Sequence, residues 1–316
     1  MDTFTQKKKI IILISGALII AFLVFLLALN QSYTRMDISV LGTGPESPTT
    51  TIQEINPFDT VAIQAKSAFV YDVANKKVLY EKNSSLQLPL ASLTKVMTAL
   101  VASEIASTTA TIQIKPTDLA ADGDNGLMAQ EKWTLKNLSD FSLVVSSNDG
   151  ADAMASAIGS TIDSSNGNNA FIQRMNVETK RLGLEQMYFL NGSGLDINES
   201  ISGGYGSAKD VAKLFEIVLK RDPHLFEATT YSEINVKSED LTHKATNTNK
   251  IVDLVPSVLA SKTGFTDLAG GNLAMAFSVG PMHPIIAVVM NSTTDGRFED
   301  MHTLIEATIA GTLSEK

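Results

Sequence analysis

The sequence contains no cysteine, and this absence excludes several kinds of site at once. Disulfide bonds, zinc-thiolate centres, lipid attachment at a cysteine and a cysteine nucleophile all need that side chain. Histidine is scarce as well, with four residues that show no ligand spacing such as a pair at positions i and i+4. We therefore expect neither a metal ion nor another cofactor. The four are His224, His243, His283 and His302.

Basic residues are outnumbered by acidic ones. The chain has 25 Lys and Arg against 34 Asp and Glu, for a formal net charge of −9 at pH 7. Nucleic acids and anionic lipid surfaces need a basic footprint, so neither is expected as the main partner. Ordinary solubility is the simplest use of this acidity.

One apolar run is long enough to cross a bilayer. Residues 10–29 are 20 consecutive residues without a charge, which as a helix reach about 30 Å. A cleaved signal peptide has a shorter apolar core and a small-residue exit. We expect an uncleaved membrane anchor at 10–29. Because lysines directly precede it, residues 1–9 are expected to form a cytoplasmic tail, with the rest of the chain outside.

The anchor is followed by a segment with little to bury. Residues 30–58 are rich in Thr, Ser, Pro and Gly, which is typical of a flexible linker. Residues 59–316 hold enough apolar sequence for one large folded domain.

Within that domain, strand patterns stand at both ends and helical patterns between them. Two aromatic runs around Asn75 predict a hairpin, apolar residues at steps of 3 and 4 from Leu93 to Ile105 predict a helix, and residues 110–225 are mostly helical in pattern. Three late strands and a closing helix follow, at Val258–Thr266, Asn272–Val279, Pro284–Met290 and Phe298–Thr312. This arrangement predicts an α+β fold, an antiparallel sheet with a helical insertion.

The first chemical motif is Ser92-Leu93-Thr94-Lys95, at the start of the predicted helix. Side chains three positions apart on a helix lie on the same face, so Ser92 and Lys95 can meet. A serine hydroxyl becomes nucleophilic when a neighbour removes its proton, and a lysine does this once desolvation or a nearby cation lowers its pKa. We expect Ser92 to be a nucleophile and Lys95 its base.

The second motif is Ser146-Ser147-Asn148, in a polar break after an apolar run. The hydroxyl of Ser146 can relay a proton, and the amide of Asn148 can hold a peptide group by its donor and its acceptor. Residues 164–166 match the same pattern, but they lie in a Gly/Asn-rich stretch typical of a connector.

The third motif is Lys262-Thr263-Gly264, on a predicted strand. Lys262 supplies positive charge and Thr263 a hydroxyl, which together suit a carboxylate. Gly264 lacks the side chain that would block a close ligand, and an extended peptide can pair along such a strand. The backbone N–H groups of Ser92 and Phe265 are candidates for an oxyanion hole. In this order the three motifs indicate an active-site serine acyltransferase.

With its surrounding blocks, the chain resembles the D-alanyl-D-alanine carboxypeptidase family of low-molecular-mass penicillin-binding proteins. The resemblance covers roughly residues 60–313. It is carried by the blocks Pro89–Ala99, Ser147–Ala151, Leu190–Asp196 and Lys262–Gly270.

The resemblance implies a penicillin-recognising fold and a serine peptidase of the bacterial envelope. Ser92 would attack the D-Ala-D-Ala bond of a peptidoglycan stem peptide, and water would hydrolyse the acyl-enzyme. β-Lactams would acylate the same serine. Arg297 falls where the family has an arginine near the substrate's terminal carboxylate, although an arginine in solvent at a helix start is an alternative.

Other readings of the motifs remain open. A class A β-lactamase shares them but needs a glutamate four residues before an asparagine, and before Asn191 that position is Met187. A DD-endopeptidase and a transpeptidase share the acylation step. A membrane-tethered protein that binds peptidoglycan or senses β-lactams with little turnover is a further alternative.

Overall fold

A computed structural model describes residues 56–120, 123 and 126–314 of the 316-residue chain. The expected tail, the expected anchor and all but the last three residues of the expected linker lie outside the described residues. Among the helices that the structure describes, none combines the length and the apolar character needed to cross a membrane.

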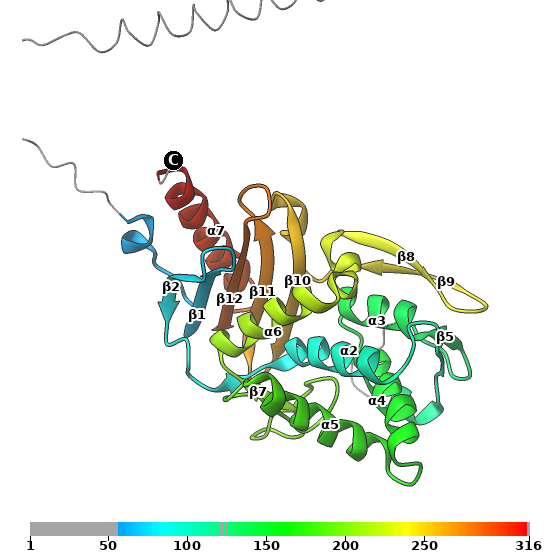
Figure 1. The fold of residues 1–316 in the computed structure, drawn as a ribbon. Coiled ribbons are helices and arrows are strands. Elements are labelled where there is room, and N and C mark those ends of the chain that lie inside the picture. The colour runs from blue at the N-terminus through cyan, green and yellow to red at the C-terminus, as the bar shows by residue number, and fades with distance from the viewer. Residues whose placement is uncertain (1–55, 121–122, 124–125, 315–316) are drawn as a thin grey trace, which may run out of the picture. The chain divides into compact units, whose positions relative to one another are not determined.

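A five-stranded antiparallel sheet joins the two ends of the described chain (Figure 1). Its strands lie in the order β10-β11-β12-β1-β2. Their bounds are β1 Ser67–Asp72, β2 Lys77–Lys82, β10 Val258–Thr266, β11 Gly270–Ser278 and β12 Pro284–Ser292. The first strand pairs with the last in a register that places Ser67 opposite Met290. The predicted hairpin and the three predicted late strands are therefore confirmed, and they belong to one sheet.

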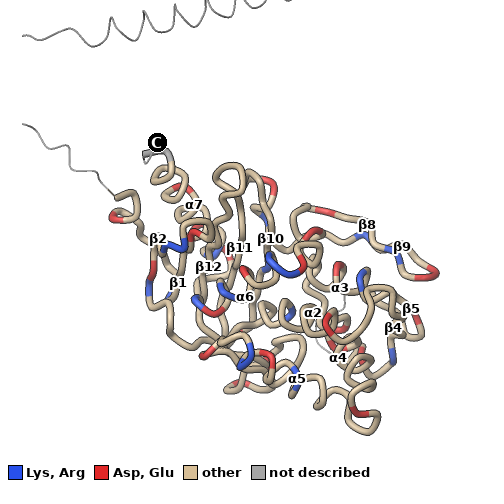
Figure 2. The backbone as a smooth tube through the Cα atoms, in the orientation of Figure 1, with Lys and Arg blue, Asp and Glu red and all other residues tan. Residues whose placement is uncertain are grey.

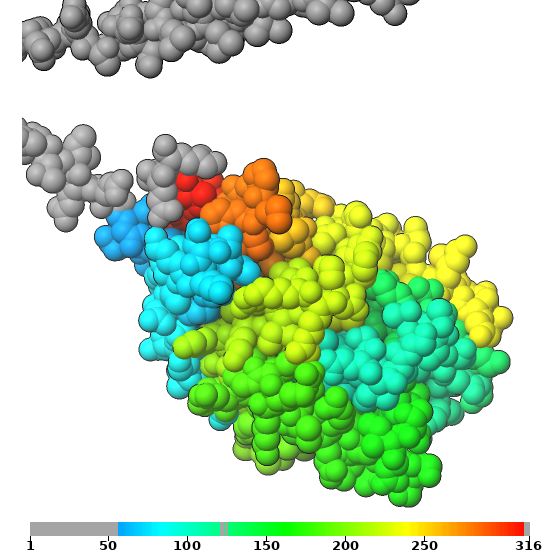
Figure 3. Space-filling view, in the orientation of Figure 1, coloured from blue at the N-terminus to red at the C-terminus, as the bar shows by residue number. Residues whose placement is uncertain are grey.

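The sheet is buried on both faces. Along β12, Ile285 and Val289 belong to one apolar cluster, and the alternating Ile286 and Val288 belong to the other. Because side chains alternate between the two faces of a strand, a strand covered on both sides has an unbroken apolar sequence. Helix α7, Gly296–Ser314, packs on one face and helix α6, Ala208–Arg221, on the other (Figures 1 and 3).

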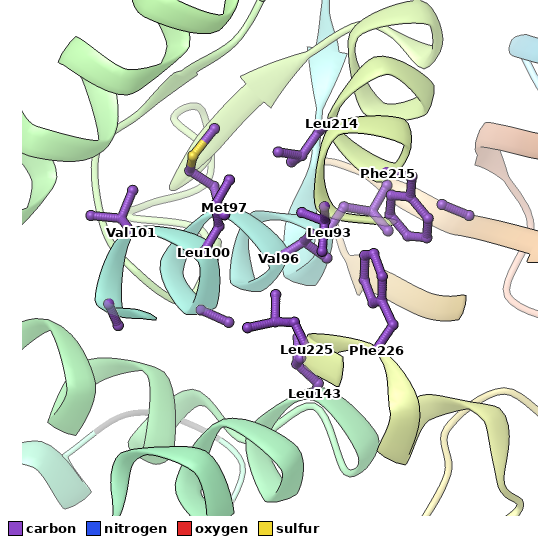
Figure 4. Packing of buried hydrophobic residues seen from close by; sticks show 14 of the residues in the cluster. Leu93, Val96, Met97, Leu100, Val101, Leu143, Leu214, Phe215, Leu225 and Phe226 are labelled. Atoms are coloured by element: carbon purple, nitrogen blue, oxygen red, sulfur yellow. The ribbon is translucent and has the colours of Figure 1, made fainter. Parts of the chain in front are cut away.

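The remaining helices form the insertion between β2 and β10. They are α2 Thr94–Ile105, α3 Leu135–Val144, α4 Asn148–Ile162 and α5 Gly167–Leu182. The predicted helix from Leu93 to Ile105 is α2, which lies between α6 and α3 (Figure 4). Its residues Thr94 to Ala102 are all buried, so the helix is enclosed on every side instead of burying a single apolar stripe.

Short strands and 3-10 turns complete the described fold. The strands are β3 Leu88–Pro89, β4 Thr111–Gln113, β5 Lys132–Thr134, β6 Tyr188–Phe189, β7 Gly204–Gly206, β8 Glu233–Lys237 and β9 Thr242–Thr246. The turns are η1 Pro57–Thr60, η2 Ala91–Leu93, η3 Pro116–Leu119, η4 Pro223–Leu225, η5 Glu227–Thr230 and η6 Val252–Leu254. Charged residues of both signs are interspersed along this backbone (Figure 2).

Two expected boundaries are shifted. Folded structure begins before residue 59, because Pro57 starts η1 and the ring of Phe58 stacks on Tyr80 at 5.7 Å between centroids. An aromatic contact with β2 places these residues in the domain instead of the linker. The Gly/Asn-rich stretch Ser164–Asn169, expected as a polar connector, is one only up to Asn166, since α5 begins at Gly167.

Candidate active site

Ser92 and Lys95 meet at the junction of η2 and α2. The Nζ atom of Lys95 lies 2.8 Å from the Oγ atom of Ser92. Ser92 is in the 3-10 turn that precedes the α-helix, not in the helix itself as predicted. The pairing is kept because Leu93 and Thr94, which separate the two residues, both have αR backbone angles, so Ser92 and Lys95 lie on the same helical face. The preceding residue, Ala91, has a φ of 48°, a left-handed conformation that is rare outside glycine and turns the chain here.

Lys95 is fully buried and all its hydrogen-bonding capacity is used. Besides Ser92, its Nζ atom donates to Asn148 Oδ1 and to the carbonyl oxygen of Ser193, each at 2.8 Å. Burial lowers the pKa of Lys95 to about 7, while the negative charge of Asp152 acts in the opposite direction. A lysine with this pKa is partly neutral at physiological pH, which is what a base toward a hydroxyl requires.

Ser146 and Asn148 enter the site from the connection between α3 and α4. Ser147 caps α4 by accepting a hydrogen bond from the Gly150 N–H, so Asn148 is the first residue of that helix. Ser146 has a φ of 64°, again in the left-handed region. A sharp turn stabilised by a helix cap thus places Asn148 in contact with Lys95 and Ser146 in contact with Lys262.

Lys262 lies on β10, the strand at one end of the five-strand order. Its Nζ atom donates to Ser146 Oγ and to the carbonyl oxygen of Thr263, each at 2.8 Å. Burial, and then the charges of Lys95 and Arg297, hold the pKa of Lys262 well below its usual value. The hydroxyl of Thr263 is 2.6 Å from that of Thr248, a residue that follows β9.

Gly264 permits β10 to lie against the nucleophile. A Cβ atom at this position would be 2.9 Å from the carbonyl oxygen of Leu90 and 3.2 Å from the amide nitrogen of Ser92. Any larger residue would push the strand away from η2, so glycine is required here for close approach. Phe265, the next residue on the strand, has a half-exposed side chain.

Arg297 reaches the site from the first turn of α7. Its side chain is 7% exposed, which rules out the alternative of an arginine in solvent. The Nη1 atom donates to the carbonyl oxygen of Gly264 at 2.7 Å, and Nε has no partner among the described residues. Burial lowers the pKa of Arg297, with Asp295 acting in the opposite direction. The guanidinium therefore retains hydrogen-bonding capacity for a ligand.

These elements enclose a cleft of about 220 Å³. Its lining contains seven of the predicted site residues, together with Leu195, Thr248 and Thr266. Lys95 and Lys262 do not line the cleft, although each contacts a serine that does. The predicted lining residues are Ser92, Ser146, Asn148, Thr263, Gly264, Phe265 and Arg297. The second Ser-x-Asn match, at 164–166, is not part of this lining.

Three residues around Lys95 were not identified from the sequence. Asp152 follows Asn148 by one helical turn, a spacing that could have identified it. Ser193 and Gly194 stand in the block at Leu190–Asp196. A Cβ atom on Gly194, whose φ is 78°, would be 1.9 Å from the carbonyl oxygen of Ala91, so glycine is required there too. This close packing seats the 191–194 segment against the nucleophile.

Comparison with known proteins identifies the family of the chain that carries this site. The sequence profile of the D-alanyl-D-alanine carboxypeptidase family matches residues 51–294. The chain belongs to the D-alanyl-D-alanine carboxypeptidase family. This confirms the resemblance on which the sequence analysis relied, and it identifies a family of serine peptidases.

Individual members of the D-alanyl-D-alanine carboxypeptidase family show how far the similarity extends. The chain is 31% identical over 243 residues to D-alanyl-D-alanine carboxypeptidase DacF of Bacillus subtilis, which covers 74% of this chain and 59% of DacF. It is 26% identical over 234 residues to a D-alanyl-D-alanine endopeptidase of Pseudomonas aeruginosa, covering 72% and 71%. The chain thus spans about three fifths of the length of DacF.

A solved structure shares the fold. Penicillin-binding protein D2 of Listeria monocytogenes, in its ampicillin-bound form, superposes with a TM-score of 0.66 at 26% identity, covering 78% of this chain and 97% of that protein. The predicted α+β, penicillin-recognising fold is therefore confirmed. All of these relatives are bacterial.

Proposed function

We propose that the protein is a serine D-Ala-D-Ala carboxypeptidase that trims peptidoglycan stem peptides. The observation that carries the proposal is the 2.8 Å contact between Lys95 Nζ and Ser92 Oγ, with the pKa of Lys95 lowered to about 7. A base of this pKa takes a proton from the serine as the oxygen attacks a carbonyl. The family to which the chain belongs supports the same reaction.

The proposed acylation is an attack by Ser92 on the substrate carbonyl, with proton transfer to Lys95 and two backbone N–H groups at the oxyanion. Ser92 Oγ attacks the carbonyl carbon of the D-Ala-D-Ala bond, and Lys95 takes the serine proton. The backbone N–H groups of Ser92 and Phe265 stabilise the oxyanion, while the C–N bond breaks. Ser146, hydrogen-bonded to Lys262, relays that proton from Lys95 to the departing amine, so that Lys95 is neutral again. Water then attacks the acyl-enzyme carbonyl, Lys95 takes the proton of the water and returns it to Ser92 Oγ as the ester bond breaks, and the shortened peptide leaves as its carboxylic acid.

The substrate would lie along β10. Asn148 holds a peptide group of the acyl side, and the edge of the strand pairs with the extended backbone. Arg297, Lys262 and Thr263 suit the terminal carboxylate, because a buried guanidinium and an ammonium strongly favour an anion and none of the cleft-lining residues is acidic. Gly264 lines the cleft at the point where β10 lies close to Ser92.

β-Lactams would acylate Ser92 and leave it slowly. A class A β-lactamase uses a carboxylate to activate the deacylating water, and the ten residues that line the described cleft include none. Met187, at the position where a class A β-lactamase has its glutamate, is a buried core residue without a carboxylate. Glu178 is fully buried in ion pairs with Arg174 and Arg181, so it does not supply that carboxylate either.

The anchoring of the domain is a separate proposal, supported by the sequence alone. Residues 10–29 would hold the protein in the bacterial cytoplasmic membrane, with 1–9 inside, 30–55 as the linker and the catalytic domain outside. Full-length protein should partition with membranes, and a chain lacking residues 1–29 should not. Recovery of both in the soluble fraction would contradict the anchor.

Intact-mass analysis tests the proposed function. The domain from about residue 56 is exposed to penicillin and, separately, to a peptide ending in D-Ala-D-Ala, beside the variant Ser92→Ala. A stable adduct on Ser92 with release of D-Ala is expected, and neither in the variant. Rapid penicillin hydrolysis without an adduct would indicate a β-lactamase. Absence of both adduct and release would indicate a binding or sensing protein, and cleavage of cross-linked muropeptides in preference to the pentapeptide would indicate an endopeptidase.

A further inference from the structure

The loop of residues 191–196 has one end at the proposed base and the other at the end of β10. At the first end, the carbonyl oxygen of Ser193 accepts a hydrogen bond from Lys95 Nζ at 2.8 Å. The carbonyl oxygen of the neighbouring Gly192 accepts a hydrogen bond from Thr98 Oγ1 of α2 at 2.6 Å. The contact with the base thus has an anchor of its own on α2.

Asp196 holds the far end of the loop against β10. Its Oδ1 atom accepts a hydrogen bond from the hydroxyl of Thr266, the last residue of β10, at 3.0 Å. Its Oδ2 atom accepts from the Leu268 N–H, in the turn that follows, at 3.2 Å. The Thr266 hydroxyl itself accepts from the Ala269 N–H at 3.2 Å, so its own proton is directed to the carboxylate. One partly buried side chain therefore joins two segments that lie 70 residues apart in the sequence.

Both of the joined segments line the cleft. Leu195, directly before Asp196, is a lining residue, and so is Thr266. The Nδ2 atom of Asn191 donates to the Leu195 carbonyl oxygen at 2.8 Å, which fixes the loop just before Asp196. Asp196 is not itself part of the lining, so it acts on a ligand through these two neighbours.

The direction of the substrate along β10 puts its acyl side at this end of the strand. In the proposed pose the terminal carboxylate lies toward Thr263, and the Phe265 N–H marks the attacked carbonyl. A strand advances about 3.3 Å per residue in one direction, so the peptide on the other side of that carbonyl runs toward Thr266. A substrate that extends past the D-Ala-D-Ala dipeptide therefore reaches the part of the cleft that Leu195 and Thr266 line.

We infer that Asp196 is a positioning residue for the acyl side of the substrate, which fixes the wall that Leu195 and Thr266 present to the residue before D-Ala-D-Ala. The inference rests on the proposed function, because attack by Ser92 defines which side of the substrate is acylated. It adds a residue outside the three motifs, and one that sets substrate preference without touching the reacting atoms. A peptide that extends past the dipeptide is the better substrate in this arrangement.

Two substrates separate recognition of the acyl side from the reaction itself. Acetyl-D-Ala-D-Ala ends close to the attacked carbonyl, whereas diacetyl-L-Lys-D-Ala-D-Ala extends further along the cleft. Values of kcat/KM for release of D-Ala are measured with each, for the wild type and for Asp196→Ala, Asp196→Asn and Thr266→Val. Glu199→Ala is the matched control, because it removes an exposed carboxylate three residues further along the chain. Circular dichroism reports the folding of each protein.

Asp196→Ala should lower kcat/KM for the tripeptide about tenfold, because two hydrogen bonds to a carboxylate are lost. The value for the dipeptide should change less than about twofold, since the contact of Ser193 with Lys95 keeps its anchor on α2. Asp196→Asn should recover part of the loss, because its amide oxygen can still accept one of the two hydrogen bonds. Thr266→Val should also lower the tripeptide value, and the double variant should lose less than the product of the two single losses. Glu199→Ala should match the wild type.

Equal losses on both peptides in a folded Asp196→Ala protein would overturn the inference and leave the proposed function intact, because they indicate a role in the fold alone. Unchanged kinetics in that variant, or a wild type that cleaves both peptides equally well, would do the same. If Asp196→Ala fails to fold, Asp196→Asn and Thr266→Val decide, and the ratio of the tripeptide value to the dipeptide value must fall in both. Wild-type protein that forms no penicillin adduct and releases no D-Ala would refute the inference together with the proposed function.

Discussion

The two walls of the cleft carry different chemistry. The helical wall, from α2 and α4, holds Lys95 next to a carboxylate that partly offsets the effect of burial. The strand wall, from β10 and α7, holds Lys262 and Arg297, and here burial and then the positive charges of Lys95 and Arg297 lower the pKa of Lys262. Both lysines are buried, at 0% and 2% exposure.

This difference shows how a neighbouring charge assigns roles to two chemically identical side chains. On the helical wall, burial lowers the pKa of Lys95 to about 7 and the negative charge of Asp152 partly opposes this effect. Lys95 can therefore lose and regain a proton near neutral pH. On the strand wall none of the lining residues is a carboxylate, and an arriving anion would favour the ammonium form of Lys262, whose pKa is lowered by burial and by the charges of Lys95 and Arg297. We therefore assign proton transfer to the helical wall and anion binding to the strand wall. Four predictions test that division.

The largest effect is expected at the base. Lys95→Met should lower the rate of Ser92 acylation by penicillin by about 10³-fold or more, because among the described residues Lys95 is the base that contacts Ser92 Oγ. Non-covalent binding of a D-Ala-D-Ala peptide should persist, since the strand wall is intact. Stopped-flow acylation and equilibrium binding measure the two quantities. Lys209→Met, an exposed lysine on α6, is the control. Loss of binding along with acylation would contradict the division.

The next effect is expected at Arg297. Arg297→Met should raise KM for a peptide carboxylate by about 10- to 100-fold with little change in kcat, because a charge-assisted contact is lost. Activity on the same peptide with an amidated C-terminus should not change. Arg297→Lys should recover only part of the affinity, since a lysine lacks the planar fork. Equal losses on both peptides, by steady-state kinetics, would mean that Arg297 supports the fold through Gly264 instead.

Lys95 should also reduce stability in a pH-dependent way. Its pKa is about 7 when folded against 10.5 as the ordinary value, so the unfolded chain binds more protons between these pH values and stability rises with pH there. At pH 7 or below, Lys95→Met should be more stable than wild type by about 2 kcal/mol, the burial penalty being partly offset by the lost hydrogen bonds. The gap should close as the pH rises and reverse sign before about pH 10, because a pKa of about 7 against 10.5 changes the stability of the wild type by more than about 2 kcal/mol over this range. Urea unfolding at several pH values measures it, and a constant gap would contradict the lowered pKa.

The smallest effect is expected at the end of the strand wall. Thr248→Val removes the hydroxyl that lies 2.6 Å from Thr263 Oγ1, and it should lower kcat/KM by about three- to tenfold. Thr246→Val, an exposed residue on β9, should have no effect. A loss of a thousandfold, in the same kinetic assay, would place Thr248 in the proton path and break the comparison.

Local sequence patterns predicted most strands of the five-stranded sheet and two of the helices. Strands β1, β10, β11 and β12 and helices α2 and α7 were foreseen because unbroken apolar runs and steps of 3 and 4 residues report burial directly. The β8–β9 hairpin was missed, since Val236 and Ala245 are its fully buried residues, Ile234 is only partly buried, and its other positions are polar. Thr248, which follows β9 and lines the cleft, was therefore missed as well.

The sequence by itself determined which chemical groups are present and in what order, because the three motifs and their flanking blocks are contiguous strings. It could not determine the state of those groups. Lys95 donates hydrogen bonds to acceptors 53 and 98 residues away, and its pKa is lowered by burial in the folded protein. Desolvation and charge act through space. Only the tertiary structure brings Lys95, with its pKa lowered to about 7, to Ser92 Oγ and Lys262 to Ser146 Oγ, and the roles proposed for the two lysines rest on these contacts.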